Sequence, residues 1–295
     1  MSEPHLIDLN DFRSNTYSQG GEDGILQKLF ATLGINNGKF CEFGAWDGRH
    51  LSNTYNLYLS GWGGWYIEGD PVRFEDLRRN ISREDTKTLL AFVMPDGVNT
   101  LDNLLAEDGK PPKVDLLSID IDSDDLAIWK SVKTFRPRVV VIEFNPTIPI
   151  DVFFENPRGE NKGNSARSIF EFGKSAGYHL VAVSRCNLIF YDARSEFQPF
   201  KTYDVANPSL RLGQRFFFGY DGTLISASSG GMDVASAPEI LSVPWHPTAI
   251  FPQPLPRHLR RYREGGFMPR LSRLICLLRT LVATPTYTLR TLFGK

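Results

Sequence analysis

Two short apolar segments, each followed by a turn with glycine and acidic residues, constrain the fold of this chain most strongly. Residues 39–43 read KFCEF and run directly into the turn GAWDG. Residues 65–67 read WYI and run into EGDP. Short apolar runs bounded by turn residues are typical of buried parallel strands. The sequence therefore predicts the first two strands of an α/β sheet, with a ligand site where the strands end.

The turn after the first strand indicates the kind of ligand. Its pattern is Glu42-x-Gly44-x-x-x-Gly48, and the glycines, with Ala45 between them, let the backbone approach a ligand closely. A dinucleotide fingerprint would instead read G-x-G-x-x-G. A carboxylate at Glu42 repels a pyrophosphate and suits a sulfonium or ammonium centre, such as that of S-adenosylmethionine (SAM). The alternative is that Glu42 and Gly44 only close a strand-to-helix turn.

The second strand ends in a further candidate for cofactor binding. Glu68 is placed to accept hydrogen bonds from both hydroxyls of a ribose, and Asp70 lies beside it. Asp70 and Pro71 also begin a predicted helix that runs to about residue 80. Residues 88–94 (TLLAFVM) predict a third strand, which is followed by a turn at 96–97.

Two helices are predicted next to these strands, and both leave alternatives open. Residues 17–34 show helical spacing, and polar residues precede it. A cap by Ser18, Glu22 or Asp23 is one interpretation. In the other, Gln19 and Glu22 line a cofactor or acceptor pocket. Residues 49–60 predict the helix after the first strand, with His50 at its start near the ligand.

Residues 113–132 predict a fourth strand, at 114–121, and a helix that covers it. Aspartates 120, 122, 124 and 125 lie at the strand exit. Asp120 and Asp122 point the same way if the strand persists. They are candidates to bind a hard cation such as Mg²⁺ or to orient an acceptor hydroxyl. Asp124 or Asp125 is expected to cap the helix.

Three more strands complete the predicted sheet. Residues 138–144 form a β-branched strand that ends in Glu143, a second-rank site candidate. Residues 151–167 are rich in Asn, Gly and charge, as expected of a lid or binding loop. Residues 178–183 and 186–191 predict an antiparallel hairpin. The pattern indicates a mostly parallel seven-stranded class I methyltransferase sheet, in the order 3-2-1-4-5-7-6, with a C-terminal extension.

Composition sets limits on the class of protein. The 295 residues are 41% hydrophobic and 23% charged, which is ordinary for a globular protein. The net charge of −1 shows no bias toward nucleic acid, so no nucleic-acid partner is expected. The cysteines (Cys41, Cys186 and Cys276) have neither disulfide nor zinc spacing. With no signal peptide and no apolar run long enough to span a bilayer, a cytoplasmic location is expected.

Three regions are predicted: a loose polar arm at 1–16, a catalytic domain at 17–256 and a basic tail at 257–295. The tail holds eight arginines and Lys295 against a single acid. Part of it, LSRLICLLRTLVA, has an apolar stripe at helical spacing. Such a helix can lie on an anionic membrane surface, which would place the protein at the inner face of a membrane. Alternatively it packs on the domain or on a partner, and homo-oligomers are a further option.

Six segments of the chain together resemble the FkbM-type SAM-dependent methyltransferases. They occur in the order of that family and cover about residues 17–190. The segments are YSQGGEDGIL (17–26), FCEFGAWDGRHLSNT (40–54), YIEGDP (66–71), NTLDNLL (99–105), DLLSIDIDSDD (115–125) and VVVIEFNPTIP (139–149).

The resemblance implies a class I Rossmann-like fold and O-methylation of a hydroxyl on a sugar, glycan or natural product. It also implies site roles: Glu42, Gly44 and Gly48 around the methionine part of SAM, Glu68 on the ribose, Asp96 or Gly97 near the adenine, and Asp120 as the acid after strand four. The chain departs from the family where K-I-D-x-E-G is usual, because residues 118–123 read SIDIDS.

The predicted reaction is in-line methyl transfer from SAM to an acceptor oxygen, in which the protein aligns the reactants. Asp120 or Asp122 is the first choice for the base, and His50 the second. If the two aspartates bind a cation, the cation lowers the pKa of the acceptor instead. Two rival functions are an NAD-dependent oxidoreductase or epimerase on a related fold, and a non-catalytic scaffold that the tail recruits to a membrane.

Overall fold

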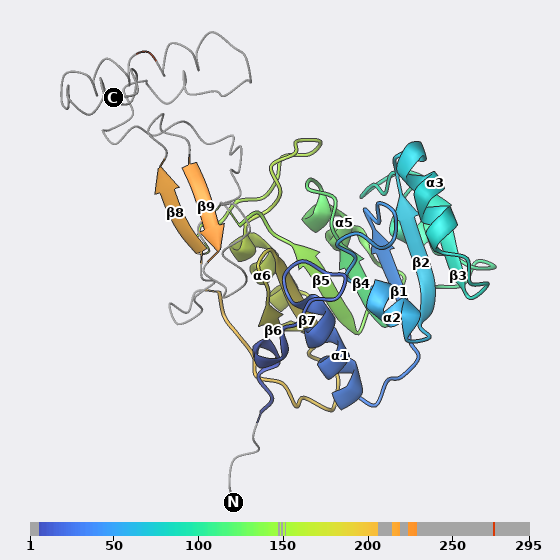
Figure 1. Cartoon of the computed structure of the whole chain (residues 1–295), viewed down its shortest axis with the longest axis horizontal. Coiled ribbons are helices and arrows are strands. Elements are labelled where there is room, and N and C mark those ends of the chain that lie inside the picture. Colours follow the sequence, from blue (N-terminus) through green and yellow to red (C-terminus); the bar gives the residue numbers. More distant parts are fainter. Residues whose placement is uncertain are drawn as a thin grey trace, which may run out of the picture. The chain divides into compact units, whose positions relative to one another are not determined.

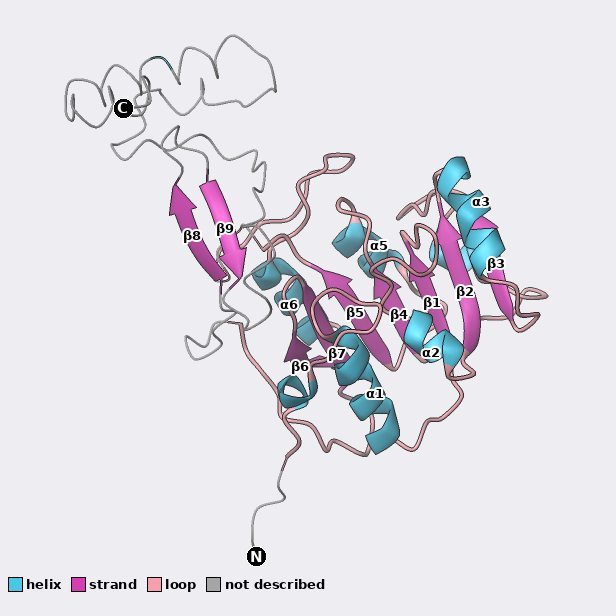
Figure 2. Cartoon of the chain, in the orientation of Figure 1, coloured by secondary structure: helices cyan, strands magenta, loops and turns pink. Residues whose placement is uncertain are grey.

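The computed structural model describes residues 6–146, 148, 150, 152–205, 214–218, 224–228 and 274. The chain divides into two units, Met1–Arg211 and Leu212–Lys295, each described by itself. The first unit holds a seven-stranded sheet with helices packed on it (Figure 1, Figure 2). The second contains an antiparallel hairpin of β8 (Gln214–Phe218) and β9 (Leu224–Ser228).

The sheet of the first unit has the strand order β3-β2-β1-β4-β5-β7-β6. Strands β1 to β5 pair in parallel, and β7 pairs antiparallel with both β5 and β6. This is the class I methyltransferase Rossmann-like fold that the sequence predicts. The strands are β1 (Lys39–Phe43), β2 (Gly63–Glu68), β3 (Thr86–Leu90), β4 (Leu116–Ile119), β5 (Val139–Glu143), β6 (Tyr178–Val183) and β7 (Asn187–Asp192).

Helices cover both faces of this sheet, which buries the central strands completely. On the face of α1 and α2 (nearest the viewer in Figure 1), Ile189 of β7 joins one hydrophobic cluster. On the other face, the next residue, Phe190, packs against Trp129 of α5. The described helices are η1 (Leu9–Phe12, a 3-10 helix), α1 (Glu22–Thr32), α2 (Tyr55–Leu59), α3 (Pro71–Asn80), α4 (Leu101–Leu104), α5 (Asp125–Ser131) and α6 (Ala166–Ser175).

Three predicted element boundaries are wrong, each for a local reason. The helix predicted at 49–60 is only α2, because residues 52–54 bind a buried carboxylate instead of forming a helix turn. The strand predicted at 88–94 is β3, two residues earlier at its start and four at its end. The strand predicted at 114–121 ends at Ile119, and Asp122 has a left-handed backbone (φ 59°).

Residues 6–16 are not a loose arm but pack on the first unit. Ile7 exchanges backbone hydrogen bonds with Pro199 and Lys201, and Leu9 is fully buried. The amide of Gly24 in α1 donates to the carbonyl of Ser14 at 3.0 Å. The prediction was wrong because the polar composition of this segment gives no indication of these few contacts.

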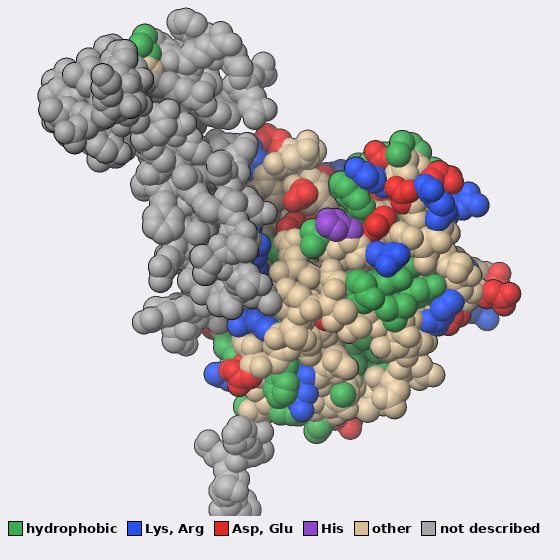
Figure 3. Space-filling view, in the orientation of Figure 1, with side chains coloured by type: hydrophobic (Ala, Val, Ile, Leu, Met, Phe, Trp, Pro, Cys, Tyr) green, Lys and Arg blue, Asp and Glu red, His purple; other side chains and the backbone are tan. Residues whose placement is uncertain are grey.

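The predicted basic tail and its boundary at residues 256–257 lie outside the described residues, apart from Leu274. None of the helices in the described residues has the length and apolar content needed to span a bilayer. On α3, acidic and basic side chains lie close together (Figure 3), and two i,i+3 ion pairs join them.

Gly24→Ala tests the packing of the N-terminal segment on α1. The added methyl group would lie 2.1 Å from the carbonyl oxygen of Phe12, so the segment must shift. We expect a loss of about 1–3 kcal/mol in the free energy of unfolding, measured by urea denaturation. Gln27→Ala, at an exposed position of the same helix, is the control. A Gly24→Ala protein as stable as wild type would contradict the packing described here.

Candidate functional site

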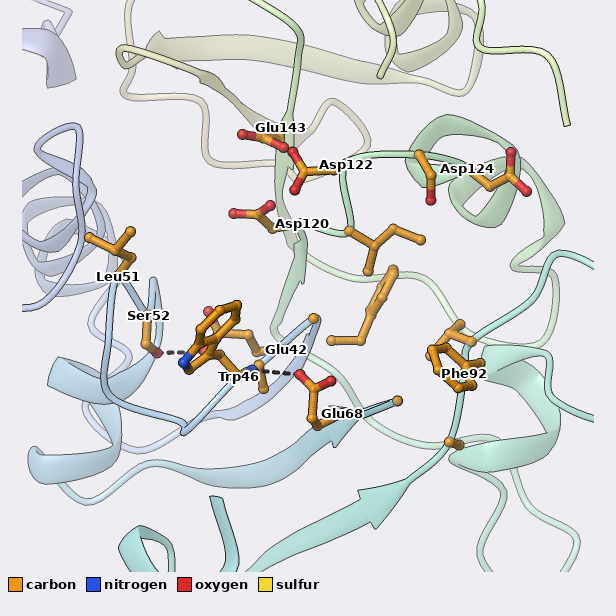
Figure 4. A pocket seen from close by; sticks show the side chains of 18 of the residues that line it. Glu42, Trp46, Leu51, Ser52, Glu68, Phe92, Asp120, Asp122, Asp124 and Glu143 are labelled. Atoms are coloured by element: carbon orange, nitrogen blue, oxygen red, sulfur yellow. Dashed lines mark hydrogen bonds between the residues drawn. The ribbon is translucent and has the colours of Figure 1, made fainter. Parts of the chain in front are cut away.

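A cavity of about 760 Å³ opens at the carboxyl ends of the parallel strands (Figure 4). Residues that follow β1, β2, β3 and β4, together with the last residue of β5, line it. Ligands of open α/β sheets bind at this edge, as predicted from the sequence. The lining includes the predicted site residues Glu42, Gly44, Ala45, His50, Glu68, Asp120 and Asp122.

Glu42 lies on the wall of this cavity, and the chain itself uses both of its carboxylate oxygens. Oε2 accepts hydrogen bonds from the hydroxyls of Ser52 and Thr54, each at 2.6 Å, and Oε1 accepts from the amide of Asn53 at 2.9 Å. Burial raises the pKa of Glu42, and these donors oppose that rise. The carboxylate therefore holds the loop before α2 in place.

The turn after β1 contacts the turn after β4 directly. Gly44 has φ +73°, and a Cβ there would lie 1.8 Å from the carbonyl oxygen of Asp120. A side chain at this position is therefore excluded on steric grounds. Gly48 faces the other way, since a Cβ there would meet Leu77 of α3 at 2.6 Å.

Glu68 points its carboxylate into the cavity from the end of β2. Oε2 accepts the amide of Trp46 and Oε1 accepts the amide of Asp70, both at 2.7 Å (Figure 4 draws the first bond). Each oxygen keeps a lone pair for a second donor. The Asp70 side chain caps α3 by accepting the amides of Val72 and Arg73. This end of the cavity is thus built around Glu68.

Three carboxylates converge at the opposite end. Oxygens of Asp120, Asp122 and Glu143 lie within 4.8 Å of one another (Figure 4). Asp120 follows β4 and Glu143 ends β5, which are neighbouring strands. The alternation predicted for the two aspartates fails because the strand does not persist. The left-handed backbone of Asp122 nevertheless returns its side chain to this group, and the second-rank candidate Glu143 completes it.

Burial and neighbouring charges raise the pKa values of Asp120 and Glu143. Burial and the nearby Asp125 raise the pKa of Asp120 to about 7, although a hydrogen bond with Glu143 opposes the rise. Burial and Asp120 raise the pKa of Glu143 well above its usual range. Because the two side chains share a hydrogen bond, we infer that Glu143 carries the proton and donates it to an ionised Asp120.

The other two aspartates at this exit do not cap α5. Asp125 accepts the amides of Ile121 and Ser123, both at 2.9 Å, and burial raises its pKa to about 6. The Asp124 carboxylate accepts the amide of Gly159 at 3.3 Å and pairs with Arg158 at 3.5 Å. The first side chain shapes the turn after β4, and the second holds the loop that leads to α6.

The remaining predicted residues divide between the cavity wall and its surroundings. His50 lines the cavity and is exposed, and its amide donates to Asp47. Asp96 pairs with Arg158 at 2.9 Å. Four predicted residues are not among the cavity lining: Gly48, Asp70, Asp96 and Gly97.

Several lining residues escaped the sequence analysis. Trp46 and Leu51 are half-exposed on the wall, and both have left-handed backbones (φ 51° and 55°). Positive φ is unusual for bulky residues and has no sequence signal. Phe92 lines the cavity at 67% exposure, although the predicted third strand would have buried it. Of the two residues that the sequence analysis offered as pocket residues, Gln19 lines the cavity, whereas Glu22 is fully buried and is not part of the lining.

No family model and no curated protein sequence matches the chain. Solved structures similar to it include a fibrillarin/Nop5p complex (17% identity, 65% of this chain and 98% of that chain, TM-score 0.37). A SAM-dependent methyltransferase from Aquifex aeolicus is 14% identical (56% and 87% covered, TM-score 0.34). One from Leishmania major is 15% identical (56% and 68%, TM-score 0.37). Similarities at this level say nothing about cofactor or substrate.

Asp120→Asn tests whether ionisation of Asp120, which is buried beside other acids, destabilises the folded protein. Because folding raises the pKa of Asp120, the folded protein binds this proton more tightly than the unfolded chain does. Wild-type stability should therefore fall as the pH rises from about 4 to about 7. The variant has no carboxyl group at position 120, so its stability should not fall with the ionisation of that group. The difference in melting temperature between variant and wild type should therefore be larger at pH 8 than at pH 5. Asp11→Asn, at an exposed position, is the control; equal gains at both pH values would contradict this destabilisation.

Proposed function

We propose that this chain is a SAM-dependent methyltransferase that methylates a hydroxyl of a sugar, glycan or natural product. The observation that carries the proposal is a single cavity with Glu68 at one end and the three carboxylates of Asp120, Asp122 and Glu143 at the other. The first end suits a ribose and the second suits an acceptor hydroxyl. Membership of the FkbM-type family rests on the six sequence segments alone.

The charge of the cavity supports SAM over NAD. Its lining contains no lysine or arginine among the described residues, and six carboxyl side chains belong to it: Glu42, Glu68, Asp120, Asp122, Asp124 and Glu143. A nicotinamide dinucleotide would bring two phosphates, which these acids repel at close range. SAM brings a sulfonium and an ammonium group, which they attract.

Three features at the Glu68 end, which we call the donor end, offer contacts for SAM. Glu68 would accept the ribose hydroxyls on the lone pairs that Trp46 and Asp70 leave free. The turn at Gly44 and Ala45 would lie along the methionine part. Phe92, at 67% exposure, offers a ring for the adenine to contact. SAM supplies an activated methyl group, and the chain supplies its alignment.

Asp120 is the residue best suited to activate the acceptor. As the acceptor oxygen forms a bond to the methyl carbon, the carbon–sulfur bond breaks and its electron pair stays on sulfur. The hydroxyl proton passes to the Asp120 carboxylate. A pKa of about 7 suits a general base near neutral pH. Glu143, by donating a hydrogen bond to Asp120, would hold that carboxylate in one orientation.

A divalent cation at the same three acids is the second candidate for acceptor activation. Oxygen ligands from Asp120, Asp122 and Glu143 within 4.8 Å of one another suit a hard cation such as Mg²⁺. Such an ion would lower the pKa of a bound acceptor hydroxyl. In that case Asp120 is a ligand and His50 is the remaining candidate for the base.

The cellular context is proposed from the sequence alone. We propose that the protein is cytoplasmic and that residues 257–295 contact the inner face of a membrane. A homo-oligomeric state is also consistent with the composition. A non-catalytic scaffold would need no convergent acids, so the group at Asp120 and Glu143 favours an enzyme.

The donor is tested by calorimetric titration of the purified protein with SAM and, separately, with NAD. We expect SAM to bind and Glu68→Ala to weaken it about 10- to 100-fold, because one or two charge-assisted hydrogen bonds are lost. Glu75→Ala, at an exposed position of α3, should bind as wild type does. If NAD binds tightly and SAM does not bind, the chain is an oxidoreductase and the proposed function is wrong.

The acceptor end is tested by formation of S-adenosylhomocysteine (SAH) with neutral methyl glycosides. Asp120→Asn should lower turnover at least about 100-fold and leave SAM affinity within a few-fold. In wild type, turnover should rise with pH through about 7, since the base must be ionised. Loss of turnover on chelation, with recovery on adding Mg²⁺, would select the cation over the base. A variant that loses SAM affinity in parallel would contradict both roles.

A further inference from the structure

Several side chains hold the backbone of the segment before α1 by hydrogen bonds. The Oδ2 atom of Asp23 accepts the backbone amides of Thr16, Tyr17 and Ser18 at 2.7–2.8 Å. The Asn15 side chain donates to the carbonyl of Gln19 at 3.1 Å. Four consecutive residues therefore have their backbones fixed directly before α1 begins.

Glu22 anchors the same segment to the start of β7. It is fully buried and accepts the amide of Gly20 at 2.7 Å, the side-chain amide of Asn187 at 2.8 Å and the hydroxyl of Ser184. A Cβ at Gly20 would lie 2.6 Å from Glu22, so the backbone passes in close contact. This anchor fixes the position of residue 19 relative to the sheet.

The side chain that this scaffold presents to the cavity is Gln19. Its amide nitrogen donates to the sulfur of Cys186 at 3.0 Å, and sulfur is a weak acceptor. Gln19 thus lines the cavity with two groups that can bind a ligand. Its amide oxygen has no hydrogen bond from the described residues, and its N–H can exchange the weak sulfur acceptor for a stronger one.

The position of Gln19 assigns it to the acceptor end. Cys186 precedes β7, whose first residue, Asn187, pairs with Glu143 in the sheet. The amide of Phe144, the residue after Glu143, donates a hydrogen bond to the carbonyl of Cys186 at 2.7 Å. Gln19 therefore lines the cavity on the side where β5 ends in Glu143, one of the three carboxylates.

We infer that Gln19 binds the acceptor and selects a polyol, a molecule with a second hydroxyl close to the one that is methylated. A hydroxyl both donates and accepts, so it matches the free oxygen and the weakly held N–H of one carboxamide. The inference rests on the proposed methyl transfer, because that function makes this end of the cavity the acceptor end.

Calorimetry on the SAH complex tests this without a known acceptor. The probes are neutral methyl hexopyranosides and their monodeoxy analogues, titrated into wild type and Gln19→Leu. We expect the variant to bind the parent glycoside about 3- to 10-fold more weakly, as for one neutral hydrogen bond. For wild type, removing one particular hydroxyl should cost the same factor, and for Gln19→Leu that hydroxyl should no longer matter.

Two controls distinguish a failure of the inference about Gln19 from a failure of the proposed methyl transfer. Gln27→Leu, on the exposed side of α1, should bind glycosides as wild type does, and SAH affinity and melting temperature should be equal in all three proteins. If SAH does not bind wild type, the proposed function fails. If SAH binds but no glycoside does, or if Gln19→Leu still discriminates every deoxy analogue, the role of Gln19 is overturned.

Discussion

The buried carboxylate of Glu42 is the interaction on which the site depends. Removing an ionised group from water is costly unless hydrogen bonds replace the solvent. Here three donors from residues 52–54 replace it, and they come from one loop. Meeting that requirement unwinds the first turn of the expected helix and delays α2 until Tyr55. It also fixes the backbone next to Leu51, which faces the cavity.

The acidic end of the cavity shows the opposite balance. Asp120 and Glu143 are brought together by the pairing of β4 and β5, with few donors to satisfy them. Their mutual repulsion is retained in the folded protein and keeps one proton between them. An arrangement that lowers stability near neutral pH is typical of residues kept for chemistry. The two buried carboxyl groups thus differ in purpose: Glu42 supports the wall of the cavity, and Asp120 is available to a ligand.

The sequence predicted the sheet well because strand signals are local. β1 and β6 have the predicted bounds, and the order of all seven strands is confirmed. The acids at the strand ends were found for the same reason. The loop before α2 and the packing of residues 6–16 depend on partners far along the chain, so no local pattern reveals them. The burial of Glu22 against the start of β7 depends on a residue 165 positions later, so neither this contact nor the place of Gln19 on the cavity wall could be read from the local pattern.

The contact between Gly44 and the carbonyl of Asp120 has a consequence for how sites of this kind diversify. With no room for even a methyl group between them, the turns after β1 and β4 form one continuous wall of the cavity, and backbone atoms set the spacing of these two turns. Mutation can hardly alter that spacing by small steps. If the proposed methyl transfer holds, new acceptors are more readily accommodated by changes in peripheral segments, such as the one that carries Gln19, than by changes in these two turns.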